Sequence, residues 1–267
     1  MKIGFLGTGK MATAIARGML TKGIVSKTDI FGVDISEKAR EEFAKNTGAQ
    51  PKALPDKMVD DADILVIAVK PQVAEDAVKS IADQGSGKLL ISIAAGLPLS
   101  KLCAWFNSQR VVRVMPNTPA MIGRGASAFC CAAEVTRKDI NDVRNILTAI
   151  GTVNKVKEEL MDAVTALSGS GPAYVFEMVQ ALTEAGTACD LPPDIAGQLA
   201  IQTVSGSAEM LSKGLGTPED LRDAVTTPGG TTAAGLAVME DNGFRKMIEK
   251  TVRAARDRSM ELGGGKG

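Results

Sequence analysis

Hydrophobic residues in the first part of the chain form short runs that alternate with longer amphipathic segments. The runs predict strands at residues 2–6, 28–34, 63–69, 88–93 and 110–115. The segments between them predict helices at residues 11–22, 37–46 and 71–84. Strands that alternate with helices favour a parallel sheet covered by helices, so we expect an α/β fold in this part of the chain.

The pattern changes beyond about residue 160, where the strand signal fades. Long segments there predict helices at residues 172–190, 192–214 and 244–262. Pro192 and Pro193 suit the first turn of the second of these helices. A chain of 267 residues is long for a single core, so we expect two domains. They are a parallel-sheet domain over residues 1–160 and an all-helical domain over residues 161–267.

Composition narrows the classes of function. The chain is 45% hydrophobic, and 31 lysines and arginines balance 31 aspartates and glutamates. Because it has no net charge, no long basic run and few aromatic side chains, we expect no nucleic-acid partner. No apolar stretch reaches the ~18 residues of a membrane span, and the N-terminal sequence suits a strand and a glycine turn rather than a signal peptide. We therefore expect a cytoplasmic protein with no membrane partner.

The chain contains no histidine, which limits the chemistry that it can perform. Ser-His-Asp and Cys-His catalysis, histidine metal sites and the commonest general acid are all excluded. The four cysteines show no CxxC spacing, so we expect reduced thiols that act as small apolar residues, and no metal site. They are Cys103, Cys130, Cys131 and Cys189.

A glycine motif follows the first predicted strand directly. In GFLGTGKMA, residues Gly7, Gly9 and Ala12 fit G-x-G-x-x-[G/A] between a strand and a helix. The first glycine permits a tight turn, the second lets the backbone approach a pyrophosphate, and the small third residue lets the helix pack on the strand. The N-terminus of the helix then faces the phosphates, so the motif predicts a dinucleotide site.

Asp34 ends the second predicted strand, 27 positions after Gly7. An acidic residue at this place is expected to bind the ribose 2′-hydroxyl and to repel a 2′-phosphate, unless it is an ordinary loop residue. The functional interpretation favours NADH over NADPH. Lys38 and Arg40 follow within six residues, and their charges can soften the repulsion.

Three further motifs end predicted strands, which is where ligands bind in open parallel sheets. They are AVKPQ at residues 68–72, SIAAGLP at residues 92–98 and MPNTPAMIG at residues 115–123. Lys70 is placed to bond cofactor phosphate or ribose, or is a solvated charge at the end of a strand. The small residues of the second motif let a flat ring approach the backbone. Asn117 lies between two prolines, in either a rigid wall or a plain turn.

The stretch PGGTT, residues 228–232, interrupts the helical pattern of the second domain. Pro228 suits a first helical turn, and the N–H groups of Gly230, Thr231 and Thr232 would then lack intrahelical partners. A carboxylate can satisfy these groups, and the Thr232 hydroxyl can donate or accept a further hydrogen bond. PGGTT is therefore predicted to hold an anion, the alternative being a cap that only stabilises the helix. SGSGPAY, residues 168–174, shows the same pattern, with serine and glycine before Pro172 at another predicted helix start.

Taken in order, these motifs resemble those of the pyrroline-5-carboxylate reductase family. The matching segments are GFLGTGKMA, AVKP, SIAAG, MPNTP, SGSGPAYVF and PGGTT, spread over nearly the whole chain. The resemblance implies an oxidoreductase of proline biosynthesis that reduces the cyclic imine 1-pyrroline-5-carboxylate to L-proline with NADH or NADPH. It also implies that residues 1–160 form a Rossmann-type domain of the α/β class. The C-terminal helical domain is then expected to bind substrate and to interlock two subunits into a homodimer, with rings of dimers in some members.

The resemblance also implies roles for individual residues. Those implied at the cofactor are Gly7, Gly9, Lys10, Met11, Asp34, Ala68, Val69, Lys70, Pro71, Ala94, Ala95, Gly96, Asn117 and Thr118. Those implied at the substrate are Thr227, Gly230, Thr231 and Thr232, with the Thr232 hydroxyl as the catalytic group that faces the ring nitrogen. Asp34 and Pro55 depart from the residues of NADPH-preferring relatives, so we expect NADH or NADPH with a preference for NADH.

Two other classes of function remain open from the sequence. A β-hydroxyacid dehydrogenase has a similar layout but relies on a lysine in its helical domain, and the lysines beyond residue 160 lie in polar settings. They are Lys213, Lys246, Lys250 and Lys266. A dinucleotide-binding module without catalysis is the more distant alternative.

Overall fold

The computed structural model describes residues 1–55 and 57–264. The chain divides into two compact units, one of Met1–Ser170 with the C-terminal end from Ala254, and one of Gly171–Arg253. The domain boundary expected between residues 160 and 161 falls inside the first unit. The physical reason is that residues 161–170 and the end of the last helix pack with the sheet, although their sequence is helical. No helix within the described part of the chain combines the length and apolarity that crossing a bilayer requires.

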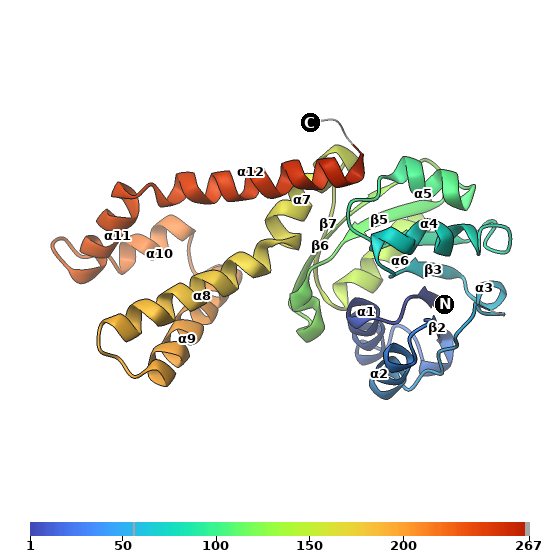
Figure 1. Ribbon diagram of the computed structural model, residues 1–267, viewed down its shortest axis with the longest axis horizontal. Coiled ribbons are helices and arrows are strands. Elements are labelled where there is room, and N and C mark those ends of the chain that lie inside the picture. The colour runs from blue at the N-terminus through green and yellow to red at the C-terminus, as the bar shows by residue number, and fades with distance from the viewer. Residues whose placement is uncertain (56, 265–267) are drawn as a thin grey trace. The chain divides into compact units, whose positions relative to one another are not determined.

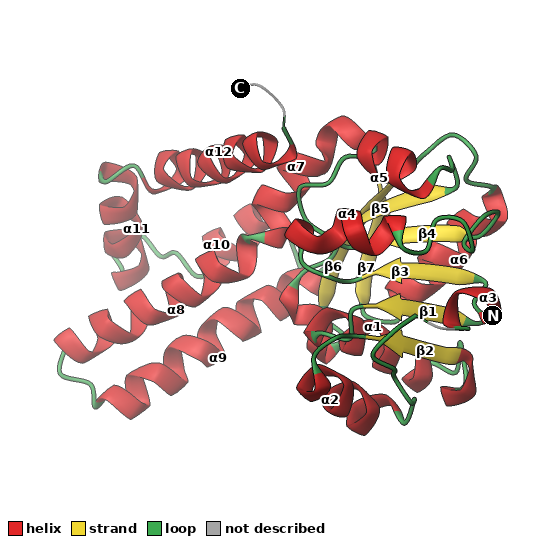
Figure 2. Ribbon diagram, turned by 45° about the vertical axis from the view of Figure 1, so that its right-hand side comes forward, coloured by secondary structure: helices red, strands yellow, loops and turns green. Residues whose placement is uncertain are grey.

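The first unit is built on a seven-stranded sheet in the order β2-β1-β3-β4-β5-β6-β7 (Figure 2). Its strands are β1 (Ile3–Leu6), β2 (Ile30–Val33), β3 (Ile64–Ile67), β4 (Leu89–Ser92), β5 (Val111–Met115), β6 (Gly125–Cys131) and β7 (Gly151–Lys155). The first five coincide with the predicted strands and run parallel. The chain order reverses direction across the sheet at β1, which lies between β2 and β3. Such a switch point leaves a crevice beside the carboxyl ends of the strands.

The expectation of a parallel sheet needs one correction. β6 pairs antiparallel with β5, and β7 then pairs parallel with β6. Neither strand gives a strong hydrophobic signal, because β6 begins with the small residues of GASA and β7 is largely exposed. A sequence pattern that detects strands by apolar runs therefore misses both of them.

Helices cover the two faces of this sheet (Figure 2). They are α1 (Lys10–Thr21), α2 (Glu37–Thr47), α3 (Met58–Asp61), α4 (Pro71–Lys79), α5 (Leu99–Phe106), α6 (Arg137–Thr148) and α7 (Met161–Val164). On β3, Ile64 and Val66 join a buried cluster with α1, α2 and α6. Leu65 and Ile67 face the opposite way, into a cluster with α3, α4 and α5. The continuous apolar run of β3 follows from this burial on both faces.

The second unit consists of helices only. They are α8 (Gly171–Ala188), α9 (Pro193–Ser212), α10 (Pro218–Ala224), α11 (Thr231–Asp241) and the first half of α12 (Phe244–Gly263). Helices α8 and α9 lie side by side as an antiparallel pair (Figure 1). Among its hydrophobic residues, only Ala196 and Ala200 are buried, whereas Phe176 is 67% and Ile201 is 59% exposed. Apolar faces of this size mark an interaction surface.

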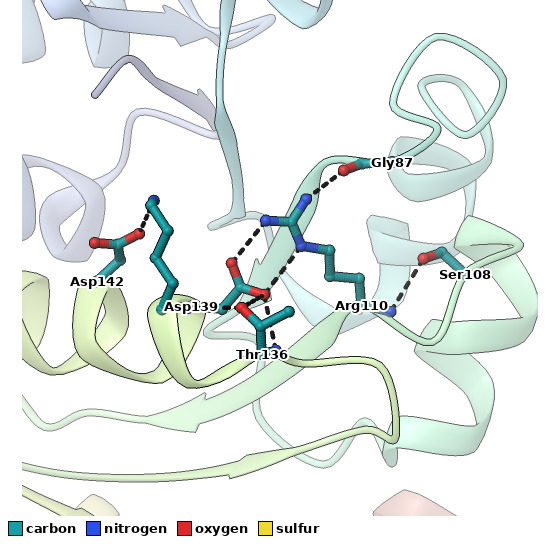
Figure 3. Close-up of polar contacts among 7 residues, drawn as sticks. Gly87, Ser108, Arg110, Thr136, Asp139 and Asp142 are labelled. Carbon is teal, nitrogen blue, oxygen red and sulfur yellow. Dashed lines mark hydrogen bonds and ion pairs between the residues drawn. The ribbon is translucent and has the colours of Figure 1, made fainter.

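An ion pair between a buried carboxylate and a partly exposed guanidinium fixes α6 to the start of β5 (Figure 3). The Arg110 guanidinium donates to both carboxylate oxygens of Asp139, at 3.0 and 2.7 Å, and also to the carbonyl of Gly87. Asp139 additionally accepts hydrogen bonds from the N–H and hydroxyl of Thr136, which caps α6. The hydrogen bonds from Arg110 are the main reason that the pKa of Asp139 falls from 3.8 to about 2.

Asp139→Asn is expected to lower the free energy of unfolding at pH 7 by about 2 kcal/mol, the size of the pKa shift. Because the folded-state pKa lies below the unfolded value, the contribution is complete above about pH 4 and is lost as the pH falls towards about 2. Urea unfolding of both proteins across this range measures the difference. Asp142→Asn is the matched control, since its partner Lys138 is exposed, and it should cost under about 0.5 kcal/mol. A pH-independent difference would contradict the assignment.

Candidate active site

The loop between β1 and α1 has the geometry of a phosphate cradle. Gly7 has a φ of +94°, and its N–H donates to the Val33 carbonyl at 2.7 Å. A Cβ at this position would lie 2.6 Å from the carbonyl oxygen of Ala68. Glycine is therefore required both by the backbone conformation and by the close approach of the β3 end.

Gly9 is the N-cap of α1 and leaves the start of that helix open. No side chain caps the helix, and a Cβ at Gly9 would meet no atom within 4 Å. Beside it, the Thr8 side chain is buried, and its Oγ1 has no hydrogen-bond partner among the described residues. The helix start, with Lys10 and Met11 as its first residues, presents free N–H groups to an anion. These residues fit the pyrophosphate of a dinucleotide.

Asp34 follows β2 directly and is bonded to the phosphate loop. Its Oδ2 accepts from the Thr8 N–H at 2.8 Å, and its Oδ1 accepts from the Ser36 N–H at 2.9 Å. The Arg40 guanidinium donates to the Asp34 carbonyl oxygen at 2.7 Å. The end of β2 therefore carries a carboxylate that already holds two backbone N–H groups, with a guanidinium beside it. The sequence predicted the acidic residue and the nearby cation but not the bond to Thr8.

The other cofactor residues implied by the sequence lie beyond the ends of β3, β4 and β5. The parallel register brings these ends to the same edge of the sheet as the phosphate loop. The residues at this edge are Ala68, Val69, Lys70 and Pro71 after β3, Ala94, Ala95 and Gly96 after β4, and Asn117 and Thr118 after β5. Lys70 is exposed and is the N-cap of α4, which starts at Pro71. Ala95 and Thr118 are also exposed, so this edge offers both small and polar groups.

The C-terminal end of α12 packs against the loop after β4. A Cβ on Gly96, whose φ is +74°, would lie 3.6 Å from the Cβ of Leu262. Lys101 at the start of α5 donates to the Gly263 carbonyl at 3.3 Å. The Ser259 hydroxyl, which is buried, donates to Asp162 on α7 at 2.7 Å.

Asp162 in turn lies 3.8 Å from the guanidinium of Arg113, a residue of β5 that is only 5% exposed. Glu158 lies 3.6 Å from the same guanidinium and accepts from the N–H of Leu99 at 2.6 Å. Sequence reasoning missed this network. The signal was present in RVVRVM, where a charge interrupts an otherwise apolar strand.

The MPNTP and SGSG motifs are joined by the side-chain amide of Asn117. Its Oδ1 accepts from the Ala126 N–H at 2.8 Å, and its Nδ2 donates to the Ser168 carbonyl at 3.0 Å. A Cβ on Gly169 would meet the Cε of Met115, so this glycine packs closely against the end of the Met115 side chain. Both polar atoms of the Asn117 amide therefore bond to backbone groups of the protein, which the sequence did not predict.

SGSGPAY differs from the bare helix start that its sequence predicts. A π-helical turn, Thr165–Gly169, follows α7 and leads directly towards α8. The Ser170 N–H donates to the Thr165 carbonyl at 2.8 Å, so the expected bare helix start is absent at Ser170. The helical pattern simply continues through a widened turn, which a 3.6-residue period does not distinguish.

PGGTT forms a turn followed by a helix start, but the roles predicted for Gly230 and Pro228 need correction. The Gly230 N–H donates to the Thr227 carbonyl at 3.0 Å, and Gly229 has a φ of +71°, as in a type II turn after Pro228. Gly230 is thus the N-cap of α11 rather than a free donor, and Pro228 precedes the helix. Thr231 and Thr232 begin the helix, and in the described chain no partner occupies their N–H or hydroxyl groups.

Three of the four free cysteines lie in settings that disfavour the thiolate. Burial raises the pKa of the Cys130 thiol to about 12, and the pKa values of Cys103 and Cys131 are also raised, mainly by burial. Cys189 is exposed. Residues 1–55 and 57–264 contain no group of three or more side chains that could hold a metal ion.

Together, the switch point in the strand order, the glycine cradle and the open start of α1 define a dinucleotide-binding protein of the Rossmann class. Comparisons with known proteins identify the family. Residues 2–96 match the model described as NADP oxidoreductase coenzyme F420-dependent, and residues 158–262 match the model of pyrroline-5-carboxylate reductase dimerisation.

Individual relatives support the same family. The pyrroline-5-carboxylate reductase of Arabidopsis thaliana is 41% identical over 98% of this chain and 95% of its own length. The Plasmodium falciparum pyrroline carboxylate reductase, solved with NADP bound, has a TM-score of 0.88 at 36% identity over 98% of both chains. The Coxiella burnetii reductase has a TM-score of 0.92 at 32% identity, over 100% of this chain and 99% of its own. The chain belongs to the pyrroline-5-carboxylate reductase family.

Gly9→Ala is expected to weaken NADH and NADPH binding by about tenfold or more while the melting temperature stays close to wild type. The added methyl group enters open space, where the pyrophosphate would approach, and a φ of −68° suits alanine. Fluorescence titration of the reduced cofactor and thermal melting measure the two effects. Gly7→Ala is the contrasting variant, because its strained φ and backbone clash should lower stability as well. Wild-type affinity in Gly9→Ala would contradict the cradle.

Proposed function

We propose that this chain reduces 1-pyrroline-5-carboxylate to L-proline with NADH or NADPH, the last step of proline biosynthesis. The observation that carries the proposal is the phosphate cradle at Gly7 and Gly9, in a chain whose full length matches reductases of this name. The open helix start at Thr231 and Thr232 adds a place for the substrate carboxylate. An NADP-bound relative supports a nicotinamide dinucleotide as the cofactor.

The chemistry suits a chain without histidine. A cyclic imine protonated on nitrogen is already an electrophile, so its C=N carbon accepts a hydride without a strong side-chain acid. The bound nicotinamide supplies that hydride, and the nitrogen keeps its proton as the C=N double bond becomes single. The residues of the sheet edge hold and orient the cofactor. Thr227 and Gly230 shape the turn, and Thr231 and Thr232 bind the carboxylate, with the Thr232 hydroxyl as the catalytic hydrogen-bonding group at the ring nitrogen.

A β-hydroxyacid dehydrogenase is less well supported, because the described part of the helical unit offers no buried lysine. Lys213 pairs with Glu209 at 3.0 Å, and Lys246 and Lys250 are exposed. Lys266 lies outside the described residues. A non-catalytic dinucleotide module is also less well supported, because it gives no ligand for the N–H and hydroxyl groups of Thr231 and Thr232 at the start of α11.

We also propose that residues 161–267 act as the substrate-binding and dimerisation domain of a cytoplasmic homodimer or ring of dimers. The support is the exposed apolar surface of α8 and α9, together with the match of residues 158–262 to the dimerisation model. A partner subunit that covers these faces would remove large apolar areas from water.

For the cofactor, we propose a preference for NADH. The Asp34 carboxylate is anchored at the end of β2, where a 2′-phosphate would approach it, and like charges repel. Arg40, held against the Asp34 carbonyl, offers a positive charge that reduces the repulsion. The balance of the two charges predicts a preference for NADH with measurable use of NADPH.

The central test is oxidation of NADH or NADPH in the presence of 1-pyrroline-5-carboxylate, with 2-methyl-3-oxopropanoate as the competing substrate. We expect turnover with the imine only. Thr232→Ala should lower kcat/KM for the imine, because it removes a hydrogen bond to a charged substrate. The lost transition-state stabilisation should be about 1.5 to 3 kcal/mol. Its cofactor affinity should stay near wild type.

Thr226→Ala is the matched control, since the Thr226 hydroxyl is already bonded to the Arg222 carbonyl at 2.6 Å. It should retain nearly full activity. If Thr232→Ala lost cofactor affinity and kept its turnover, the substrate role of PGGTT would be wrong. If the wild type turned over only the aldehyde, the family activity would not apply to this chain.

Cofactor preference is tested by kcat/KM values for NADH and NADPH. Wild type should favour NADH, and Asp34→Asn should raise the NADPH-to-NADH ratio about tenfold, or about 1.4 kcal/mol. Asparagine keeps one acceptor for the Thr8 N–H, so the phosphate loop stays anchored better than with serine. Arg40→Gln should shift the ratio in the opposite direction. A ratio unchanged in both variants would place neither charge at the ribose, whereas general destabilisation would lower both values together.

A further inference from the structure

Asn117 occupies a junction between three segments of the first unit. It follows β5, its Oδ1 holds the Ala126 N–H at the start of β6, and its Nδ2 holds the Ser168 carbonyl in the π turn. Both halves of the amide are therefore used, and the side chain is half-buried. An amide is the only neutral side-chain group that offers an acceptor and an NH₂ donor in this arrangement.

The Ser168 carbonyl has a particular need for a donor. In a continuous α-helix it would accept from the N–H of residue 172, four positions later. Residue 172 is proline, which has no N–H. The Nδ2 of Asn117, 3.0 Å away, supplies the donor that the proline cannot.

The same turn is fixed on its other side by packing. Gly169 packs closely against the end of the Met115 side chain, and the Ser168 Oγ donates back to the Val164 carbonyl at 3.0 Å. The π turn thus has a defined position relative to the end of β5, where Asn117 and the proposed cofactor residue Thr118 lie. π turns are common at functional sites because they displace the chain from its regular path.

We propose that Asn117 is a positioning residue for imine reduction. By donating to the Ser168 carbonyl, it fixes the π turn of residues 165–169 against the end of β5, beside the sheet edge that we propose holds the cofactor. The inference rests on the proposed reductase function and assigns Asn117 a role through the protein backbone rather than on the cofactor. It predicts an effect on kcat that exceeds the effect on cofactor affinity.

Asn117→Asp tests the donor directly. Aspartate keeps an acceptor for the Ala126 N–H, but when ionised it places a charged oxygen against the Ser168 carbonyl. Protonation of the introduced carboxyl at low pH converts this oxygen into an O–H donor to the Ser168 carbonyl. The ratio of variant to wild-type kcat should therefore be reduced about tenfold or more at high pH and should rise as the pH falls. The dissociation constant for NADH should change less than threefold.

Asn145→Asp, at an exposed position of α6, is the matched control for the added charge and should leave the ratio near one at every pH. A pH-independent ratio for Asn117→Asp, or a loss in NADH affinity that equals the loss in kcat, would overturn the proposal. Absence of imine turnover in the wild type would instead refute the proposed function, which separates the two failures.

Hydrogen exchange provides a readout that does not depend on turnover. Amides in residues 165–170 should exchange faster in Asn117→Asp at high pH than in wild type, and the difference should shrink at low pH after correction for intrinsic rates. If Asn117→Asp does not fold, Asn117→Ala replaces it in the kcat and exchange measurements. Unchanged exchange across residues 165–170 in the variant would overturn the positioning role.

Discussion

A guanidinium in the middle of an apolar strand must be compensated, because an unpaired buried charge costs several kcal/mol. At Arg113 in β5, compensation comes from Glu158 and Asp162, which are contributed by the segment just before and within α7. Glu158 also holds the first N–H of α5, and Asp162 holds the hydroxyl of Ser259 near the end of α12. One buried charge therefore gathers three helices at one face of the sheet.

This arrangement bears on the site because two of those helices border its loops. The N-terminus of α5 follows the Ala94–Gly96 loop directly, and the end of α12 packs on Gly96. The position of the loop is then set by side chains that lie outside it. The phosphate loop is held in a comparable way, since the Asp34 carboxylate bonds the Thr8 N–H across two strands. Both loops owe their geometry to carboxylates that bind backbone or cation rather than ligand, which is the kind of support that pre-organised sites require.

The sequence predicted those features that repeat or that carry a backbone requirement. Apolar runs predicted five of the strands. The glycine motif with Gly7 and Gly9 was recognisable because a tight turn and a close backbone approach need residues without side chains. The pattern did not predict β6 and β7, because small residues and an exposed edge strand give little hydrophobic signal. The π turn at Thr165–Gly169 and the engaged Gly230 N–H depend on individual hydrogen bonds between positions that no period connects. Likewise, the roles of Asn117, Asp162 and Ser259 come from partners between 9 and 97 residues away.

Helix α12 starts in one compact unit and ends in the other, which has a consequence for the order of events during synthesis. Ser259 and Leu262 leave the ribosome only after the whole segment Gly171–Arg253 has been made. Until then, Asp162 lacks its hydroxyl donor, and the loop at Gly96 lacks the side chain that covers it. The nascent sheet can pair its strands early, since domains generally form from the N-terminus as the chain emerges. Its ligand-facing edge, however, reaches its final form only when the helical unit has been completed, so unfinished chains would carry an incomplete cofactor site.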